Sequence, residues 1–452
     1  MVTDYIVAIY LGTSHLVGMV GKKNSRGALS IVAEEVKESS GCIRRGRIHN
    51  VAETAARIKR LVQELQNQLP NLRIEKVYIG IGGQSLRSID HSEVRTVRPD
   101  AFVTEEDIRL LNEQCKNYRP EMSDVLAVAP PVYYLDDKRT SNPVGVACRR
   151  IEARYKLVVG QPIIRKSIVN SVEQQAGITV AGIIVSPLAL AEAILTRNEK
   201  ELGCAVIDFG AGVTSIVVYK NGHLAYLSVV PLGSDLITRD LTSLSLVESE
   251  AERLKITYGN AKPNENQEGS ISLDTIDGIG TRKINLSEID LVVEARVKEI
   301  VENVYARMEE NKLTNALGAG IVLVGGGAAL KNLQELVRDT FKLQEVRYTT
   351  IRKGLMEETG EKIGDPRYMS AISLLLQGTE SCVGPIRRKQ EEPVPPPQPV
   401  TPPVETVQEP EPAIEPDRPE REDDPRPKQR SQKRGGFFGG IGRIARGLFD
   451  EE

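Results

Sequence analysis

Residues that build covalent or metal-based sites are scarce in this chain. The five cysteines are scattered, odd in number and without a CxxC pair, and none of the four histidines has a partner at metal-ligand spacing. The sequence therefore excludes a disulfide scaffold and a zinc ribbon, and it is typical of a reducing compartment. No apolar run reaches the roughly 18 residues of a membrane-spanning helix. The first apolar stretch also lacks the basic segment of a secretory signal, so we expect neither a spanning helix nor a signal peptide.

An excess of one charge is also missing. The 59 Lys and Arg residues are balanced by 62 Asp and Glu residues, which leaves a net charge of −3. Nucleic-acid binding needs a basic face, so this balance argues against a nucleic-acid partner. At roughly 150 residues per domain, the 452 residues predict about three units of core.

Proline is concentrated near the C-terminus. Fourteen of the 25 prolines lie between Pro385 and Pro427, among many acidic residues. Such a segment buries little apolar surface, and we expect an extended, disordered linker. The chain is thus predicted to consist of a globular body (about 1–382), a linker (383–433) and a short tail (434–452).

The body alternates between strand and helix patterns. β-Branched runs followed by glycine predict strands at 5–9, 77–81, 205–207 and 321–324. Apolar residues at helical spacing predict amphipathic helices at 51–69 and 288–310. This alternation predicts an α/β fold with mixed sheets.

Two distant segments of the body resemble each other. DYIVAIYLGTSHLVGMV (4–20) and GCAVIDFGAGVTSIVVY (203–219) each combine a strand, a tight glycine turn with small or hydroxylated residues, and a second strand. In this correspondence Tyr10 matches Asp208, and Gly12 matches Gly210. The separation of 198 residues is too long for a solenoid repeat. The repeat instead predicts two related lobes, each presenting a hairpin to one shared cleft.

Each glycine turn has the composition of an anion-binding loop. Backbone N–H groups of such a turn can surround an anion, and small residues let the backbone approach a phosphate. Asp208, directly before the second turn, is placed to hold Mg²⁺ through water. The alternative for either turn alone is an ordinary hairpin turn. The candidate phosphate-binding residues are Gly12, Thr13 and Ser14 in the first turn, and Gly210, Ala211, Gly212 and Thr214 in the second.

Two further segments indicate a nucleoside site. Gly325, Gly326 and Gly327 follow an apolar strand and open a helix, where a flat ring or a ribose can lie against the backbone. The segment is neither a Walker loop, which needs GK[ST], nor a G-x-G-x-x-G loop. Glu252 and Lys255, spaced i,i+3 on a predicted helix, are candidates to bind ribose hydroxyls. The alternatives are a tight strand–helix turn and a solvated ion pair within one helix.

The order of these elements resembles a known family. Hairpin, connecting helix, hairpin and glycine triplet are similar to the actin/Hsp70/sugar-kinase ATPase superfamily, and within it the chain most resembles the FtsA family of bacterial cell-division proteins. The resemblance covers nearly all of 1–382 and the tail, and its most specific part runs from VYIGIGGQSLRSI to NPVGVACRRIEARYKLVVG (77–160). FtsA proteins carry their own α/β subdomain, called 1C, at this point of the first lobe. The helix predicted at 104–115 would belong to it.

The resemblance implies an actin-like two-lobed ATPase fold. Its parts would be the first-lobe core, subdomain 1A, in three pieces (1–83, 162–198 and 351–382); subdomain 1C (84–161); the second-lobe core, subdomain 2A, in two pieces (199–239 and 313–350); subdomain 2B (240–312); a disordered Pro-rich linker (383–433); and a C-terminal amphipathic helix (434–452).

The resemblance also implies ATP and Mg²⁺ between the lobes. The two glycine turns would bind the phosphates, and Asp208 would hold the metal through water. Glu252 and Lys255 would contact the ribose or adenine, and the glycine triplet at 325–327 would form the adenosine motif.

The partners that the resemblance implies belong to the division machinery. The chain would polymerise head to tail and tie the ring of FtsZ, a tubulin-like division protein, to the cytoplasmic face of the inner membrane at the division site. Subdomain 2B would capture the C-terminal peptide of FtsZ, and 1C would contact a neighbouring copy and later division proteins. Arg296, Lys298 and Arg307 on the helix at 288–310 are candidates for the FtsZ contact; the alternative is a solvated helical face.

Two positions depart from the pattern of the superfamily. Tyr10 stands where the wider fold carries an acidic residue; tyrosine is neutral at pH 7 and a poor partner for Mg²⁺. The alternative for Tyr10 is simple packing beneath the cleft. Ser186, in GIIVSPLALAEAIL (182–195), stands where active members carry Glu or Gln to position water. A missing base costs roughly 10² to 10⁴ in rate, so we assign no catalytic residue and expect slow or absent ATP hydrolysis.

The tail has the pattern of an interfacial helix. In KQRSQKRGGFFGGIGRIARGLFDEE, apolar side chains share one helical face, and basic residues stand opposite and upstream. An apolar face for the acyl boundary and basic residues for anionic headgroups are typical of a membrane-surface helix. The alternative is a helix that docks in a groove of a partner. The residues predicted to contact the membrane are Phe437, Phe438, Ile441, Arg443, Ile444, Arg446, Leu448 and Phe449.

Three other functions would use the same fold. A phosphotransferase or chaperone ATPase would need the catalytic groups that Tyr10 and Ser186 replace. A pilus-assembly adaptor similar to PilM would not need the amphipathic tail. A cell-shape filament similar to MreB would lack the insertion at 77–160 and would carry its membrane helix at the N-terminus.

Overall fold

The computed structural model describes residues 4–39, 41–98, 102–263, 269–274, 280–357 and 364–385. These residues belong to one compact unit, Met1–Arg388. The predicted tail, and the predicted linker beyond Pro385, lie outside the described residues. Among the helices of the described ranges, none is both long and apolar enough to cross a membrane.

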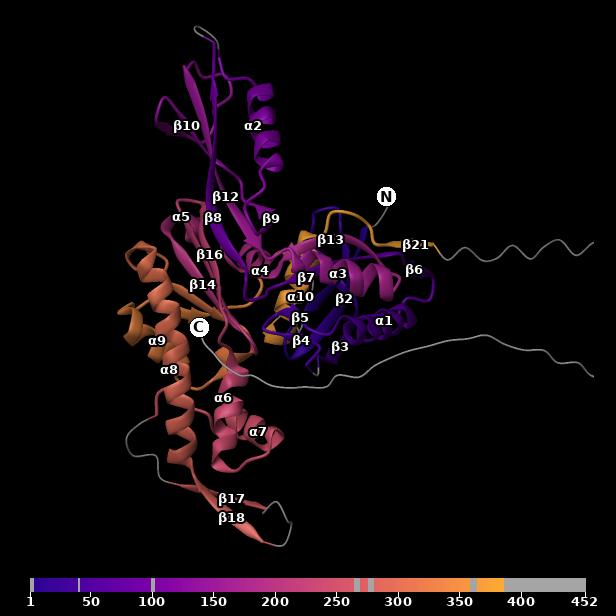
Figure 1. The fold of residues 1–452 in the computed structure, drawn as a ribbon, viewed down its shortest axis with the longest axis vertical. Coiled ribbons are helices and arrows are strands. Elements are labelled where there is room, and N and C mark those ends of the chain that lie inside the picture. Colours follow the sequence, from indigo (N-terminus) through magenta and orange to yellow (C-terminus); the bar gives the residue numbers. More distant parts are fainter. Residues whose placement is uncertain are drawn as a thin grey trace, which may run out of the picture. The chain divides into compact units, whose positions relative to one another are not determined.

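The first lobe is built on a five-stranded sheet with the order β13-β7-β1-β2-β3; Figure 1 labels β13, β7, β2 and β3 of this sheet. β1 runs parallel to β7, and β7 runs parallel to β13, while β1 and β2 form an antiparallel hairpin. Central strands covered on both faces need apolar residues throughout, and residues 6–9 of β1 are fully buried. The strands are β1 (Asp4–Leu11), β2 (His15–Lys23), β3 (Leu29–Glu38), β7 (Lys76–Ile81) and β13 (Thr179–Val185).

Helices cover both faces of this sheet, and glycines let them approach closely. α1 (Val51–Asn67) packs at Gly18, where an added Cβ would lie 2.2 Å from Leu61. α10 (Pro366–Gln377) packs on the opposite face at Gly80, where an added Cβ would lie 2.2 Å from Leu374. The other helices of this lobe are α3 (Ile163–Ile168), continued by a π-helical segment (Val169–Gln175), and α4 (Ser186–Ile194).

Residues between β7 and α3 form a separate α/β subdomain at the position expected for 1C. An antiparallel sheet packs one face against α2 (Glu105–Asn117), with Leu111 and Tyr155 buried between them. The Thr104 side chain accepts a hydrogen bond from the Asp107 N–H, and Asp107 accepts one from the Thr104 N–H, so a capping box begins this helix. The strands are β8 (Arg87–Thr96), β9 (Asp124–Val128), β10 (Val132–Leu135), β11 (Lys138–Thr140) and β12 (Arg150–Gly160).

The second lobe continues the sheet of this subdomain. Its strand order is β16-β15-β14-β19-β20, and one residue pair between β16 and β8, Ser228 and Arg87, joins it to the strands of 1C. The strands are β14 (Cys204–Phe209), β15 (Thr214–Lys220), β16 (His223–Val230), β19 (Ile321–Val324) and β20 (Val346–Tyr348). The helices are α5 (Arg197–Leu202), α6 (Ser234–Leu241), α7 (Glu248–Tyr258), α8 (Leu286–Glu310) and α9 (Leu333–Phe341).

Short elements complete the described residues. They are the 3-10 turns Thr242–Leu244, Thr314–Ala316 and Gly326–Ala329, and the strands β4 (Ile43–Arg44), β5 (Arg47–Ile48), β6 (Leu72–Ile74), β17 (Ser270–Asp274), β18 (Thr281–Asn285) and β21 (Val383–Pro385).

The secondary structure predicted from the residue patterns is confirmed. The four predicted strands lie within β1, β7, β14 and β19, and the two predicted amphipathic helices are α1 and α8. All five cysteines are free. β21, at the start of the predicted linker, pairs with β6, so strand pairing continues to Pro385.

A carboxylate is buried without a partner in α8. Asp290 is 2% exposed, and neither of its oxygens has a hydrogen-bond partner among the described residues. Burial raises the pKa of Asp290; Lys331 opposes this shift and Glu294 adds to it. The folded state therefore holds the proton more tightly than the unfolded chain does. The free energy of unfolding should fall as the pH rises from about 4 toward the raised pKa.

We expect Asp290→Asn to stabilise the protein at high pH. The amide has no charge to bury, so the free energy of unfolding should rise by roughly 1 kcal/mol at pH 8 and by less at pH 5. Urea unfolding at the two pH values measures the difference. Glu302→Gln, at an exposed position of the same helix, is the control and should change neither value. An equal gain at both pH values would contradict this explanation.

Candidate functional site

The two glycine turns predicted from the sequence repeat have the same backbone geometry. In the first turn the Gly12 N–H donates to the His15 carbonyl at 3.1 Å, and in the second the Gly210 N–H donates to the Val213 carbonyl at 3.0 Å. The first turn joins β1 to β2, and the second joins β14 to β15. The predicted internal repeat is therefore a repeat of structure, with one copy in each lobe.

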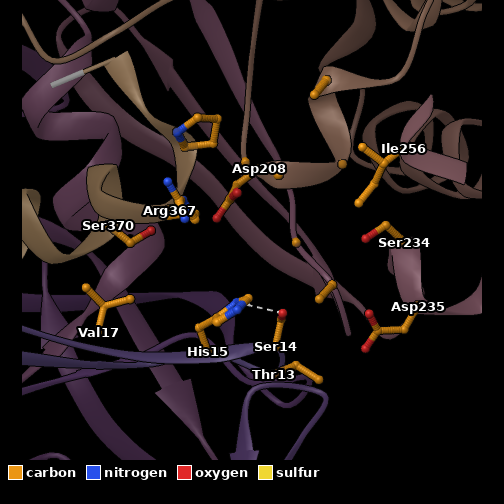
Figure 2. A pocket seen from close by; sticks show the side chains of 18 of the residues that line it. Thr13, Ser14, His15, Val17, Asp208, Ser234, Asp235, Ile256, Arg367 and Ser370 are labelled. Carbon is orange, nitrogen blue, oxygen red and sulfur yellow. Dashed lines mark hydrogen bonds between the residues drawn. The ribbon is translucent and has the colours of Figure 1, made fainter. Parts of the chain in front are cut away.

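Both turns face one cavity of about 340 Å³ (Figure 2). Gly12, Thr13 and Ser14 line it from the first lobe, and Gly210 and Ala211 line it from the second. The cavity also brings together the other candidates, which are Tyr10, Asp208, Glu252, Lys255, Gly325, Gly326 and Gly327. The shared cleft predicted from the sequence repeat is thus present.

Two candidates of the second turn do not line this cavity. Gly212 faces the first turn, and an added Cβ there would lie 2.5 Å from Thr13 Oγ1. Thr214 is fully buried, and its hydroxyl donates to the Leu232 carbonyl at 2.9 Å. The Thr214 side chain therefore closes the base of the hairpin, and Gly212 permits close contact between the lobes.

The turns offer free backbone donors to an anion. The N–H groups of Gly12 and Gly210 close their own turns, whereas those of Thr13, Ser14 and Ala211 have no acceptor among the residues that the structure describes. Ser14 Oγ lies 2.7 Å from His15 Nδ1 (Figure 2). Unpaired N–H groups from two turns at one cavity are the arrangement that binds phosphate oxygens.

Asp208 and Tyr10 form the floor between the turns. Burial raises the pKa of Asp208 to about 6. Burial also raises the pKa of Tyr10, and the neighbouring Asp208 carboxylate adds to this shift, while a hydrogen bond with Ser370 opposes it. Tyr10 is therefore neutral at pH 7, and of this pair Asp208 alone carries a charge there. A bound cation would hold Asp208 in the ionised form.

Lys255 differs from the solvated ion pair that its spacing also allows. Its ammonium group is buried, and it lies 2.6 Å from Glu252 Oε2 on the same helix. It also donates to Thr238 Oγ1 at 2.9 Å and to the Ser234 carbonyl at 3.3 Å, both on α6. Three acceptors use its three hydrogens. Lys255 therefore fixes α7 against the start of α6, and Glu252, which is more exposed, is the better candidate to meet a ribose.

Sequence reasoning missed the first turn of α6. Ser234 and Asp235 line the cavity (Figure 2). Burial raises the pKa of Asp235, and Lys255 opposes this shift. The segment LGSDLITRDL carried a signal for these residues, because a glycine followed by Ser-Asp favours a helix start. The N–H groups of Ser234 and Asp235 donate to the Gly210 and Ala211 carbonyls at 3.0 and 2.8 Å, so the helix start is bonded to the second turn.

The N-terminal end of α10 also reaches the cavity. Pro366, Arg367 and Ser370 line it from the first lobe (Figure 2). Asp365 caps this helix, and its carboxylate binds the Arg367 guanidinium. Pro at the first helical position predicts the helix start, but the sequence holds no signal that places it beside the glycine turns.

Other candidates lie away from the cavity. Ser186 is buried at the start of α4, outside the cavity lining, and its hydroxyl has no partner among the described residues. On α8, Arg296 binds Asp240 and Glu299, and Arg307 lies 3.7 Å from Glu310. Lys298 is exposed. Ion pairs within the molecule thus occupy two of the three basic residues predicted to meet FtsZ.

The residues around Asp208 fit a magnesium ion that is held mainly by phosphates and water. The described residues contain no group of three or more His, Cys, Asp or Glu side chains that could form a complete metal site. Mg²⁺ usually keeps several waters and takes one or two carboxylates together with substrate phosphates. A single carboxylate between the two glycine turns is the donor set expected for such an ion.

Comparison with known proteins identifies the family. The family model described as cell division protein FtsA matches residues 205–373, and the model of the SHS2 domain inserted in FtsA matches residues 83–159. The cell division protein FtsA of Porphyromonas gingivalis is 33% identical over 384 residues, which cover 84% of this chain and 80% of that protein. FtsA of Bacillus subtilis is 29% identical over 377 residues, which cover 82% of this chain and 83% of that protein.

A solved structure shares the fold. A chain of the PilM–PilN type IV pilus biogenesis complex matches with a TM-score of 0.59 and 17% identity, over 82% of this chain and 98% of that chain. The predicted actin-like two-lobed α/β fold is confirmed. The FtsA model covers the second lobe and reaches into α10 of the first, the SHS2 model falls on the inserted subdomain, and the relatives span both lobes. This chain belongs to the FtsA family of cell division proteins.

Proposed function

We propose that this protein binds ATP with Mg²⁺ between its lobes, polymerises, and ties FtsZ to the cytoplasmic face of the cell membrane at the division site. One observation carries the nucleotide part of the proposal. Two turns with the same backbone geometry, one from each lobe, line one cavity with residues whose N–H groups have no acceptor among the described residues.

The proposed binding mode assigns each wall of the cavity a part of the nucleotide. The N–H groups of the two turns bind phosphate oxygens, and Asp208 holds Mg²⁺ through water. Bound Mg²⁺ neutralises phosphate charge. Glu252 meets the ribose, Lys255 keeps α7 in place, and the backbone of the glycine triplet at 325–327 receives the adenosine. An added Cβ at Gly326 would meet no protein atom within 4 Å, which leaves room beside it for a ring.

Filament formation follows from closure of the lobes in this proposal. Thr13 and Gly212 already touch across the cavity edge, so a nucleotide bound by both turns fixes the angle between the lobes. A fixed angle gives every copy the same end surfaces, which head-to-tail assembly needs. The tail at 434–452 then anchors the filament to anionic lipid, and many tails on one filament bind more firmly than one.

The proposed partners divide between the two inserted subdomains. Subdomain 2B (240–312) captures the C-terminal peptide of FtsZ. Subdomain 1C (84–161) contacts a neighbouring copy and recruits later division proteins. Lys298 is the basic residue of α8 that we propose for the FtsZ contact, because Arg296 and Arg307 already have acidic partners.

Titration calorimetry of the full chain with MgATP tests the nucleotide site. We expect binding in the micromolar range or tighter. Gly212→Val should weaken it at least about fivefold, because overpacking by a few atoms typically costs 1–3 kcal/mol and would push the turns apart. Gly82→Ala is the control, since its nearest neighbour beyond the adjacent residues would be an atom of Pro187 at 3.9 Å. The proposal would be refuted if MgATP produced no heat of binding and no thermal stabilisation of the protein.

Tyr10→Asp is expected to raise ATP hydrolysis. The residue faces Asp208 on the cavity floor, and a second carboxylate there would help to hold Mg²⁺ and to orient water. Recovery of a positioned acid or base is worth roughly 10² to 10⁴ in rate, and we expect at least about tenfold, because Ser186 also lacks a basic group. Phosphate release at saturating MgATP measures it.

Tyr10→Phe separates charge from packing in this experiment. It keeps the ring and removes the hydroxyl, so the hydrolysis rate should stay at the wild-type level. If Tyr10→Asp hydrolyses ATP no faster than the wild type while still binding it, Tyr10 does not limit the rate.

A further inference from the structure

A small hairpin lies directly behind the first glycine turn. β4 and β5 are joined by Arg45 and Gly46, both in the left-handed region with φ of 48° and 67°. The Gly46 N–H donates to Thr13 Oγ1 at 2.9 Å. Because this bond occupies the oxygen as an acceptor, the hydroxyl hydrogen of Thr13 stays free to meet a phosphate oxygen. The hairpin thus orients a side chain of the cavity wall.

The other side of this hairpin holds the residues through which the chain enters subdomain 1C. We call residues 82–86 and 160–162 the root of 1C, because the first segment precedes β8 and the second contains the last residue of β12 and the two residues after it. The Gln84 N–H donates to the Arg45 carbonyl at 3.1 Å. An added Cβ at Gly46 would lie 2.8 Å from the Gly82 carbonyl oxygen and from Gly83 Cα. The hairpin and the entering strand are therefore in backbone contact.

The leaving strand is tied to the same hairpin. The Arg47 guanidinium donates to Gln161 Oε1, and the Gln161 N–H donates to Ser85 Oγ at 3.3 Å. Neither Arg47 nor Gln161 lines the cavity between the lobes. One two-strand hairpin thus contacts Thr13 on one side and both ends of the 1C root on the other.

Subdomain 1C has a second attachment, on the other lobe. Ser228 of β16 pairs with Arg87 of β8, and the Leu227 N–H donates to Ser88 Oγ at 2.9 Å. Figure 1 shows β8 beside β16. The first residues of β8 are therefore held by the second lobe, within three residues of the root that the hairpin holds on the first.

This double attachment has a mechanical consequence. A change in the angle between the lobes moves the hairpin relative to β16. Packed backbone contacts do not stretch, because protein interiors are close-packed and shift as units. Both attachments survive such a movement only if 1C itself turns. Thr13, which touches Gly212 of the second lobe, places the hairpin at the point where the lobes meet.

We infer that the β4–β5 hairpin couples the nucleotide cavity to the orientation of subdomain 1C, with Arg47 and Gln161 as positioning residues. The inference rests on the proposed nucleotide binding and adds a regulation to it. Occupation of the cavity sets the surface that 1C presents to its partners. Because such coupling is reciprocal, a partner that fixes 1C changes the affinity for ATP by the same factor.

Amide hydrogen exchange of the full chain, with and without saturating MgATP, tests the coupling. The protein is kept monomeric by dilution, with its mass checked, so that assembly does not protect 1C. In the wild type, MgATP should slow exchange at 11–15 and 210–214, where it binds, and also in the root of 1C. We expect amide exchange in the root to slow at least about fivefold, which is the lower end of the range typical of allosteric coupling.

The variants separate the coupling from binding. Arg47→Ala combined with Gln161→Ala should keep the ATP response of both turns and lose most of the response of the root. Gly83→Ala should do the same by another route, because its Cβ would lie 2.8 Å from the Gly46 carbonyl oxygen. Arg44→Ala, on the same hairpin and exposed, is the control and should respond as the wild type does.

Each failure has a distinct signature. If MgATP protects the turns of the wild type but not the root, or if the root of both coupling variants responds as in the wild type, the coupling is refuted while nucleotide binding stands. If MgATP protects neither the turns nor the root of the wild type, the proposed nucleotide site fails, and the coupling fails with it.

Discussion

Removal of residues 435–452 is expected to abolish co-sedimentation of the protein with anionic vesicles. Six large apolar side chains of the tail, each partly buried at roughly 1 kcal/mol, contribute about 6 kcal/mol. Basic residues near an anionic surface add about 1 kcal/mol each. The six glycines between 435 and 447 oppose helix formation by close to 1 kcal/mol each. A single tail is thus a weak anchor, and assembled protein should bind far more firmly than monomer.

Pelleting with vesicles of phosphatidylglycerol and phosphatidylethanolamine, with and without MgATP, measures this effect. Leu448→Asp places a charge on the predicted apolar face and should reduce pelleting strongly. Asp450→Asn, on the acidic end of the tail, is the matched control and should pellet at least as well as the wild type. Unchanged pelleting after removal of the tail would mean that the described unit or the linker carries the membrane contact, and the tail hypothesis would be wrong.

The sequence was sufficient for the parts of the site that lie on the repeated hairpin. A short apolar strand, a glycine turn and a second strand specify their own geometry, because each turn is closed by a bond between residues three apart. Two copies of one local structure also predict a pseudo-symmetric pair of lobes. The cavity followed from this symmetry, without knowledge of any contact between the lobes.

Contacts between distant segments set the limit of sequence reasoning. The spacing of Glu252 and Lys255 shows that they share a helix face, but it does not show that Thr238 and the Ser234 carbonyl bury the ammonium group. Gly212 and Thr214 match the pattern of an anion-binding turn. In the structure, however, Gly212 packs against Thr13, and the Thr214 hydroxyl donates to the Leu232 carbonyl. Such neighbours come from lobe packing, which no local pattern encodes.

The hairpin behind the first turn shows a second limit. β4 and β5 have two residues each, too few for a period-2 pattern to be recognised. Its signal is the pair Arg45–Gly46, since glycine favours a turn with positive φ. The contacts of this turn with Thr13 and with residue 84 depend on the tertiary fold alone.

Gly325→Ala is expected to destabilise the second lobe and to remove ATP binding. Gly325 has φ 91° and ψ 164°, a region that is essentially restricted to glycine and costs other residues roughly 1–3 kcal/mol. The added Cβ would also lie 2.3 Å from Asp208 Oδ1 and 2.6 Å from the Phe209 carbonyl oxygen. Overpacking of this kind costs a further 1–3 kcal/mol or so. We therefore expect a loss of about 2–6 kcal/mol in the free energy of unfolding.

The neighbouring glycine provides the matched control. Gly326 has no positive φ, and its added Cβ would meet no protein atom within 4 Å, so Gly326→Ala should unfold at the wild-type urea concentration. Both variants add one methyl group, at neighbouring positions. A difference in their free energies of unfolding therefore reports the backbone conformation of Gly325 and its contact with Asp208. Equal stability of both variants would show that the turn after β19 relaxes at little cost in free energy. Gly325 would then be dispensable for holding Asp208 toward the cavity.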